Sequence, residues 1–273
     1  MRFFSWLKPK ERSLSRAKPV QRVLSYQCAS LQGVGTRERQ EDAYELLNAG
    51  DVTRIRDMGL LALVADGMGG MQNGSLASNM AIGLITADYE LMDRNQPLEP
   101  QLAGSIDHAC EEVYGELKGM GGSTVVACLL YDEKLYYAGA GDSFLYLLRQ
   151  GRLIRLNRAH TLKNQRYLEL INADCMDPTS ARTMAEAHAV TQFLGVDMLD
   201  DVDWFRRAMP LEDGDTLLLC SDGIAGVLSE SQLAEYLNME NINDSCARMQ
   251  QAILEKNLVH QDNFTGIVIR CKK

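Results

Sequence analysis

Aspartates recur in this chain at the ends of short apolar segments, usually beside a glycine. Three directly follow such a segment, a fourth precedes the last one, and a Glu-Asp pair comes shortly after the first; they are Asp66, Asp142, Asp222, Asp262 and Glu41-Asp42. A single Asp-Gly after a strand is most often only a turn. Several such motifs in one sheet would bring like charges together, and the acids would then take up protons or destabilise the fold. The pattern therefore predicts a sheet edge at which divalent cations with oxygen ligands neutralise the acids.

Hydrophobic periodicity predicts both strands and helices. The expected strands cover residues 26–35, 60–65, 123–131, 134–140, 144–148, 153–156, 216–220 and 264–270, and the expected helices cover 73–93, 101–118, 162–173, 181–189, 230–237 and 244–258. Asp132-Glu133 and Gln150-Gly151 each separate two strands and indicate hairpins, which imply antiparallel sheets. The helices do not alternate strictly with strands, which argues against a doubly wound parallel sheet. We expect one α+β domain over residues 23–273.

The composition is that of a soluble globular protein, with 46% hydrophobic and 24% charged residues. The net charge of −9 argues against nucleic-acid binding, which needs a basic surface, and suits the binding of cations. No apolar run reaches the roughly 18 residues of a membrane span. Seven cysteines without a C-x-x-C pair indicate reduced, buried thiols. We therefore expect a cytoplasmic protein without a membrane location.

The first 22 residues differ from the rest of the chain. They are basic, contain Pro9 and Pro19, and lack the long apolar core of a signal peptide. We expect a mobile basic arm over residues 1–22 that is frayed. Docking of Trp6 on a membrane surface or a partner is the alternative interpretation.

A pair of bridged metal ions at the acidic edge would suit phosphate-ester hydrolysis. Such ions lower the pKa of a bridging water and orient it for in-line attack on phosphorus. Arg37 lies four residues before Glu41, and its planar guanidinium matches phosphate oxygens, although a lone exposed arginine is usually a solvated charge. Gly67 would let a backbone carbonyl face a metal, and Gly69-Gly70 would free the turn into the next helix.

Six motifs in this order resemble those of the bacterial metal-dependent serine/threonine phosphatases of the protein phosphatase 2C type (PPM family). They are Gly35 and Arg37 with Glu41 and Asp42, residues 64–70, 122–124, 141–143 and 221–223, and Asp262 with Asn263 and Thr265. The resemblance extends over residues 26–271. It implies a four-layer α-β-β-α sandwich, in which two antiparallel sheets are flanked by helices and hold two Mn²⁺ or Mg²⁺ ions, and a third ion in some members.

The resemblance also implies roles for individual residues. Asp66 would bridge both metals, the Gly67 carbonyl would bind one of them, and Asp222 and Asp262 would bind the other. Glu41 and Asp42 would act mainly through metal-bound waters, Arg37 would bind the substrate phosphate, and Asp142 would help to hold a third metal with Asp222. The variable segment 161–190 corresponds to a flap beside the active site.

The chain departs from the family pattern at three positions. Met68 replaces a histidine proposed as a general acid in eukaryotic members, Ala159 replaces an acid in an Arg-Asp-His motif, and Gln192 replaces a usual arginine. None of these removes a predicted metal ligand, but the last two lie beside the flap and bear on substrate choice. Two other features do not indicate a functional site. His260 is expected to have a surface or packing role, and Asp200-Asp201 with Asp203 are expected to form a solvated acidic loop.

The sequence therefore predicts a monomeric phosphatase that acts in signal transduction on phosphoserine and phosphothreonine in proteins phosphorylated by a bacterial serine/threonine kinase. Two alternatives stay open. One is a pseudophosphatase that binds regulatory proteins without turnover, and the complete set of Asp66, Asp222 and Asp262 argues against it. The other is a metal phosphoesterase that acts on nucleotides or sugar phosphates, although no adenine- or ribose-binding motif supports it.

Overall fold

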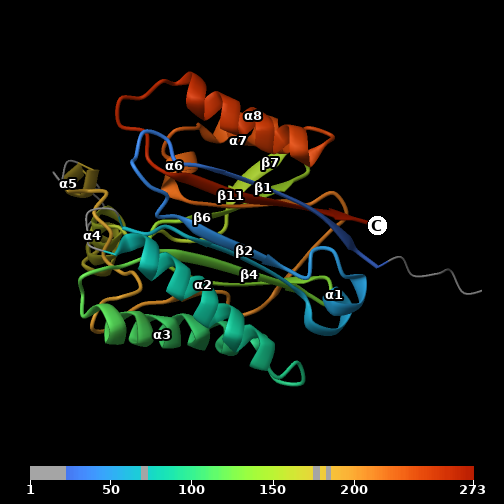
Figure 1. The fold of residues 1–273 in the computed structure, drawn as a ribbon, viewed down its shortest axis with the longest axis horizontal. Coiled ribbons are helices and arrows are strands. Elements are labelled where there is room, and N and C mark those ends of the chain that lie inside the picture. The colour runs from blue at the N-terminus through green and yellow to red at the C-terminus, as the bar shows by residue number, and fades with distance from the viewer. Residues whose placement is uncertain (1–22, 69–72, 175–178, 183–185) are drawn as a thin grey trace, which may run out of the picture.

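Two antiparallel sheets form the centre of the molecule (Figure 1). The computed structural model describes residues 23–68, 73–174, 179–182 and 186–273. One sheet has the strand order β1-β11-β10-β6-β7 and the other β2-β3-β4-β5-β8, with β9 also pairing with β5. The strands are β1 Ser25–Gly33, β2 Ala43–Leu47, β3 Leu60–Ala65, β4 Val125–Tyr131, β5 Lys134–Ala140, β6 Phe144–Arg149, β7 Arg152–Arg155, β8 Asp203–Trp204, β9 Met209–Pro210, β10 Thr216–Cys220 and β11 Phe264–Lys272.

Helices cover the outer faces of both sheets, which gives the predicted four-layer α-β-β-α sandwich (Figure 1). Helices α2 and α3 pack on the sheet that contains β3, and α7 and α8 pack on the sheet that contains β11. The helices are α1 Val52–Met58, α2 Gly74–Leu91, α3 Leu98–Leu117, α4 Leu162–Asn172, α5 Thr179–Arg182, α6 Asp222–Ala225, α7 Glu230–Leu237 and α8 Ile242–Glu255.

The alternation of side chains along β3 shows how the layers are held together. Leu61 and Leu63 face α2 and α3, whereas Leu60, Ala62 and Val64 pack between the two sheets. Successive side chains of a strand point to opposite faces. Every residue of β3 is buried because both faces are covered, and for this reason the strand is a continuous apolar run in the sequence.

The two predicted hairpins are confirmed. Asp132 and Glu133 join β4 to β5, and both have positive φ values of 51° and 56°. Gln150 and Gly151 join β6 to β7 with φ values of 51° and 75°. Two consecutive residues with positive φ produce the tight turn whose twist matches that of antiparallel strands.

Some predicted elements were wrong or were missed. Of the helix expected over residues 181–189, the described part contains only residues 181–182, which end the short helix at residues 179–182, whereas residues 186–188 form a turn. The helix α3 begins before Pro100 rather than after it, because proline is tolerated in the first helical turn. The strand β2, the helices α1 and α6, and the short strands β8 and β9 were not predicted, since each is too short for a clear periodic signal.

Several sequence predictions fall outside the described residues. The basic arm, Gly69-Gly70 and Cys175 belong to this group. The other six cysteines are free thiols, and all except Cys28 are buried, as expected. No helix in the described ranges combines the length and the apolar character needed to cross a bilayer.

Candidate metal-binding active site

The strand ends that carry the predicted site residues meet at one end of the sandwich. The paired residues nearest to that end are Ala43–Ala65, Val125–Ala140, Cys220–Gly266 and Gly33–Phe264. One or two residues beyond these pairs lie the five predicted aspartates, Asp42, Asp66, Asp142, Asp222 and Asp262. Because neighbouring strands are antiparallel, residues that follow one strand and residues that precede the next come together at the same edge.

Asp42 is held by a buried serine of the opposite sheet. Its side chain is 5% exposed, and Oδ2 accepts a hydrogen bond of 2.9 Å from the Ser221 hydroxyl. Ser221 Oγ in turn accepts from the Thr265 backbone N–H at 3.0 Å. Asn263 adds a second link between the sheets, since its Oδ1 accepts from the Glu41 backbone N–H at 2.7 Å. These buried contacts fix the two sheets to each other where the acids lie.

Asp66 is fixed through its backbone. The Thr124 N–H donates to the Asp66 carbonyl at 2.9 Å, and the Ser123 hydroxyl donates to the same oxygen at 3.1 Å. The Asp66 N–H donates to Thr124 Oγ1 at 3.3 Å. These bonds fix the Asp66 backbone and do not use its carboxylate.

The acids raise one another's pKa. Burial raises the pKa of Asp142 to about 7, and the charge of Asp222 adds to this shift. Burial also raises the pKa of Asp42 to about 6. The pKa of Asp66 lies well above its ordinary value, first because of burial and then because of the charges of Asp42 and Asp222. Burial and the charge of Asp262 raise the pKa of Asp222. Such mutual repulsion is the property that a bound cation would relieve.

The donor set fits hard divalent cations. It consists of carboxylate and carbonyl oxygens, which suit Mg²⁺ and Mn²⁺. Asp42 Oδ1 is buried and has no hydrogen-bond partner among the described residues, so this carboxylate oxygen could take a further ligand. Within the described ranges, no three Asp, Glu, His or Cys side chains form a group that could hold a single ion as they stand. The assignment of metal ligands therefore remains a prediction, supported by the carboxylate cluster and by this unpartnered oxygen.

Gly67 occupies a position without room for a side chain. A Cβ atom there would lie 2.4 Å from the Glu41 carbonyl oxygen and 2.4 Å from that of Gly74. The Gly67 N–H donates to the Glu41 carbonyl at 3.2 Å, and the next residue, Met68, donates to the Gly122 carbonyl at 3.0 Å. The backbone after β3 is thus packed tightly against the loop that carries Glu41, which only a glycine allows without a shift of that loop.

Arg37 lies at the rim of the acidic cluster. Its Nη2 is 2.7 Å from Asp262 Oδ2, and about half of each side chain is exposed, 50% and 44% respectively. The Asp262 hydrogen bond is the first cause that raises the pKa of Arg37, and the charges of Glu41 and Asp66 contribute. A guanidinium has five N–H donors, so Arg37 retains donors for a phosphate group.

The sequence predicted that Asp200-Asp201 and Asp203 form a solvated acidic loop, but two of these acids bind Arg158. Asp203 Oδ2 accepts a hydrogen bond of 2.8 Å from the Arg158 backbone N–H, and the Asp201 carboxylate pairs with the Arg158 side chain. Asp201 Oδ2 also lies 3.8 Å from His160 Nε2. Ala159 is buried at 4% exposed, so a carboxylate at that position would lack solvent. Asp201 thus brings a carboxylate to Arg158 and His160 from elsewhere in the chain.

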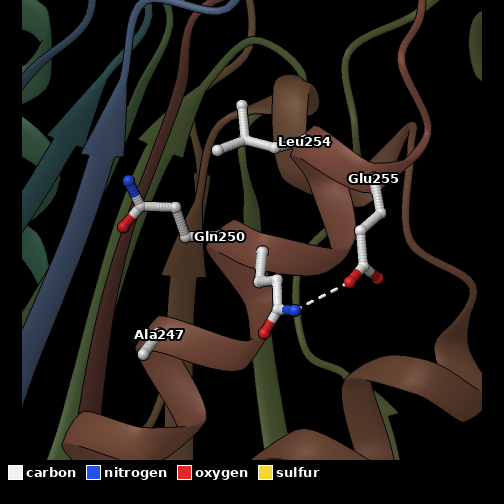
Figure 2. Close-up of a pocket in the computed structure, with 5 residues that line it drawn as sticks. Ala247, Gln250, Leu254 and Glu255 are labelled. Atoms are coloured by element: carbon white, nitrogen blue, oxygen red, sulfur yellow. Dashed lines mark hydrogen bonds between the residues drawn. The ribbon is translucent and has the colours of Figure 1, made fainter.

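Two hollows lie outside the acidic cluster. The first, of about 500 Å³, lies on the outer face of α8 between Ala247, Gln250, Leu254 and Glu255 (Figure 2). The second, of about 440 Å³, lies between β7, α4 and β8. Neither is lined by a predicted metal ligand. The acidic cluster therefore remains the candidate site.

Sequence reasoning gave no role to several residues that hold the site together. Ser123, Thr124, Ser221 and Asn263 stand in the recognised motifs, but their contacts join residues far apart in the chain. His160 belongs to the segment that resembles the family's Arg-Asp-His motif, but it was given no role, because it has no ligand spacing and its partners lie in other segments.

Comparisons with known proteins agree with this geometry. The sequence profile of the protein phosphatase 2C family matches residues 38–261. The serine/threonine phosphatase stp of Listeria monocytogenes is 32% identical over 197 residues, which cover 69% of this chain and 75% of that protein. The Streptococcus agalactiae serine/threonine phosphatase shares the fold, with a TM-score of 0.75, 24% identity, and coverage of 90% of this chain and 99% of that one. The catalytic domain of PstP, solved with two manganese ions, has a TM-score of 0.71 at 23% identity and covers 92% and 100% of the two chains. The chain belongs to the protein phosphatase 2C family.

Proposed function

We propose that this chain is a metal-dependent phosphatase that hydrolyses phosphoserine and phosphothreonine in proteins. The observation that carries the proposal is the set of five aspartates at one end of the sandwich, four of which have raised pKa values. The relatives named above are serine/threonine phosphatases, and the PstP catalytic domain carries two manganese ions. The chain's own residues supply what such a reaction requires.

Asp66, Asp222 and Asp262 are proposed as metal ligands, together with the Gly67 carbonyl. Asp42 and Glu41 would hold metal-bound waters, and Asp142 would serve a third ion beside Asp222. Bound Mn²⁺ or Mg²⁺ would make a water molecule nucleophilic at neutral pH. The raised pKa of Asp66 supports this assignment, because the causes are burial and then the charges of Asp42, Asp222, Asp142 and Asp262.

Arg37 is proposed to bind the substrate phosphate. Its contact with Asp262 holds it next to a proposed metal ligand, and its remaining N–H groups are free to donate to phosphate oxygens. Met68 follows Asp66-Gly67 where a general acid would otherwise stand, so we propose that water protonates the leaving group.

Residues 161–190 are proposed to form the flap of a single catalytic domain that comprises residues 23–273. The bridge between Thr161 and Val190 closes the base of this segment. A site at the rim of the sandwich beside such a segment suits a phosphorylated loop of a protein. We further propose that a bacterial serine/threonine kinase phosphorylates the substrates, and that residues 1–22 form a basic arm. The chain is proposed to act as a monomer in cytoplasmic signalling, and the free cysteines of its described part fit a reducing compartment.

The test is phosphate release from an aryl phosphate and from phosphoserine and phosphothreonine peptides, with and without manganese. We expect hydrolysis that requires Mn²⁺ and stops on chelation. Rapid hydrolysis after complete removal of metal would contradict the proposal. Tight binding of phosphoproteins without turnover, at any metal concentration, would instead favour the pseudophosphatase.

A further inference from the structure

His160 binds both backbone polar groups of one residue of the acidic site, Gly141. Its ring Nδ1 accepts a hydrogen bond of 3.0 Å from the Gly141 N–H, and its own backbone N–H donates to the Gly141 carbonyl at 2.8 Å. The histidine is 5% exposed. Gly141 immediately precedes Asp142, so His160 fixes the backbone from which that carboxylate extends.

The backbone N–H of Gly141 depends on the His160 ring as its hydrogen-bond acceptor. Gly141 follows the last residue of β5 and has a φ of +103°, where a Cβ atom would lie 2.5 Å from the Thr124 side chain. A buried N–H without an acceptor is costly, and the described contacts give this N–H no acceptor other than His160 Nδ1. On the other side of Asp142, Ser143 Oγ lies 2.7 Å from Thr124 Oγ1. The Asp142 backbone is therefore held before and after the residue.

The orientation of the His160 ring is defined by its surroundings. Because Nδ1 accepts a hydrogen bond, the proton of a neutral ring is on Nε2. Nε2 is buried and has no hydrogen-bond partner within the described chain, while Asp201 Oδ2 lies 3.8 Å away. Arg158 pairs with the same Asp201 carboxylate. Asp201 thus places a negative charge on the side to which the ring N–H points.

His160 also contacts the segment from Thr191 to Asp203, the first residue of β8. Its carbonyl oxygen accepts a hydrogen bond of 2.9 Å from the Thr191 N–H. Asp201 and Asp203 of the same segment bind Arg158, two residues before His160. The histidine therefore links the segment up to Asp203 to the Asp142 loop, in addition to the pairing of Asp203 with Gly139.

We propose that His160 is a positioning residue that acts through Gly141 to hold the Asp142 carboxylate beside Asp222, with Asp201 orienting the ring. The proposal rests on the proposed metal-dependent function. It assigns no contact with substrate or metal to His160 itself. Loss of the Nδ1 acceptor is expected to weaken metal binding through Asp142, in the range of about 10- to 100-fold seen when residues behind metal ligands are changed.

The experiment compares His160→Leu with His160→Asn. Asparagine places Oδ1 one bond from Cγ, as histidine places Nδ1, so it can still accept from Gly141, whereas leucine cannot. Mn²⁺ binding is followed by electron paramagnetic resonance of the free ion, and the Mn²⁺ concentration for half-maximal aryl phosphate hydrolysis is measured in parallel. We expect His160→Leu to raise that concentration about tenfold with an unchanged KM for the aryl phosphate, and His160→Asn to stay within about twofold of the starting protein.

A double-mutant cycle separates positioning from general destabilisation. In an Asp142→Asn background, His160→Leu should have no further effect on Mn²⁺ binding, because the carboxylate that it positions is gone. Asp215→Asn serves as the control, since it breaks a buried contact with Arg149 at the opposite end of β10. This variant should lower stability and leave the Mn²⁺ dependence unchanged.

Two results would overturn the inference. One is a folded His160→Leu protein with the Mn²⁺ dependence of the starting protein, and the other is a full effect of His160→Leu in the Asp142→Asn background. If His160→Leu does not fold, Asp201→Ala replaces it in the cycle, with a smaller shift in the same direction that also disappears in that background. An unaltered chain without Mn²⁺-dependent hydrolysis would overturn the proposed function, whereas failure of the cycle alone leaves that function intact.

Discussion

The Arg37 guanidinium donates to the Asp262 carboxylate across 2.7 Å, so the proposed phosphate-binding residue and a proposed metal ligand are direct neighbours. Both side chains are about half exposed, and ion pairs of this kind contribute less than about 1 kcal/mol to stability. The contact therefore matters for the placement of the guanidinium rather than for folding.

Replacement of Arg37 by alanine should raise KM for an aryl phosphate more than it lowers kcat. The physical reason is that loss of a phosphate contact that is equally strong in the ground state and in the transition state raises KM and leaves kcat unchanged. Steady-state kinetics at saturating Mn²⁺ measure both constants. Arg56→Ala is the matched control, because it removes another exposed arginine that pairs with an aspartate, on α1. An unchanged KM in Arg37→Ala would exclude this residue from the site.

Asp66→Asn should reduce hydrolysis on the order of 1000-fold. Loss of a carboxylate that is proposed to bridge both metals would remove several kcal/mol of metal-dependent stabilisation of the transition state, and each 1.36 kcal/mol is tenfold in rate. The measurement is Mn²⁺-dependent turnover alongside the count of bound Mn²⁺. Asp244→Asn, an exposed carboxylate of α8, should keep full activity. Equal loss in both variants would show that the effect is not specific to the site.

The metal-free protein should become less stable as the pH rises from about 4 to about 7. Burial raises the pKa of Asp142 from 3.8 to about 7, so the folded state binds a proton more tightly than the unfolded state. Stability is then highest below the unfolded pKa and is lost as the pH rises through the folded pKa, by on the order of 4 kcal/mol from this residue.

Urea unfolding in the presence of a chelator, at pH 5 and at pH 8, measures this pH dependence. Asp142→Asn should reduce the difference between the two values, and Mn²⁺ at pH 8 should restore stability by binding the folded state. Equal unfolding free energies at both pH values would contradict the uncompensated acidic cluster.

Gly67→Ala and Gly83→Ala should have opposite effects. A methyl group at Gly67 would lie 2.4 Å from two carbonyl oxygens, so the loop must shift and both stability and activity should fall. At Gly83, on the exposed side of α2, an added Cβ atom would have no described atom within 4 Å apart from the helix's own nearby backbone, and alanine should stabilise the helix by about 1 kcal/mol. Thermal unfolding and turnover of the two variants test this pair. A fully active, stable Gly67→Ala protein would show that the close approach is not required.

The sequence predicted the larger elements and the acidic motifs because both are encoded locally. Apolar runs such as Leu60–Ala65 and turn residues such as Gln150 and Gly151 express the structure of their own segment. Elements with weak local signals, such as β2, become strands only because a neighbour pairs with them. The helix expected over residues 181–189 was wrong over residues 186–188, which form a turn.

By itself, the sequence determined which residue types stand at the strand ends, since each Asp or Asp-Gly lies directly beside an apolar segment in the chain. Only the tertiary structure decided which of them are neighbours and what holds them. Arg37 meets Asp262, and Ser221 meets Asp42, across separations of 225 and 179 residues. The His160 ring accepts a hydrogen bond from Gly141, and Asp201 forms an ion pair with Arg158, although no local pattern predicts either contact. These contacts arise from the register of antiparallel strands and from burial, which depend on the whole chain rather than on any one segment.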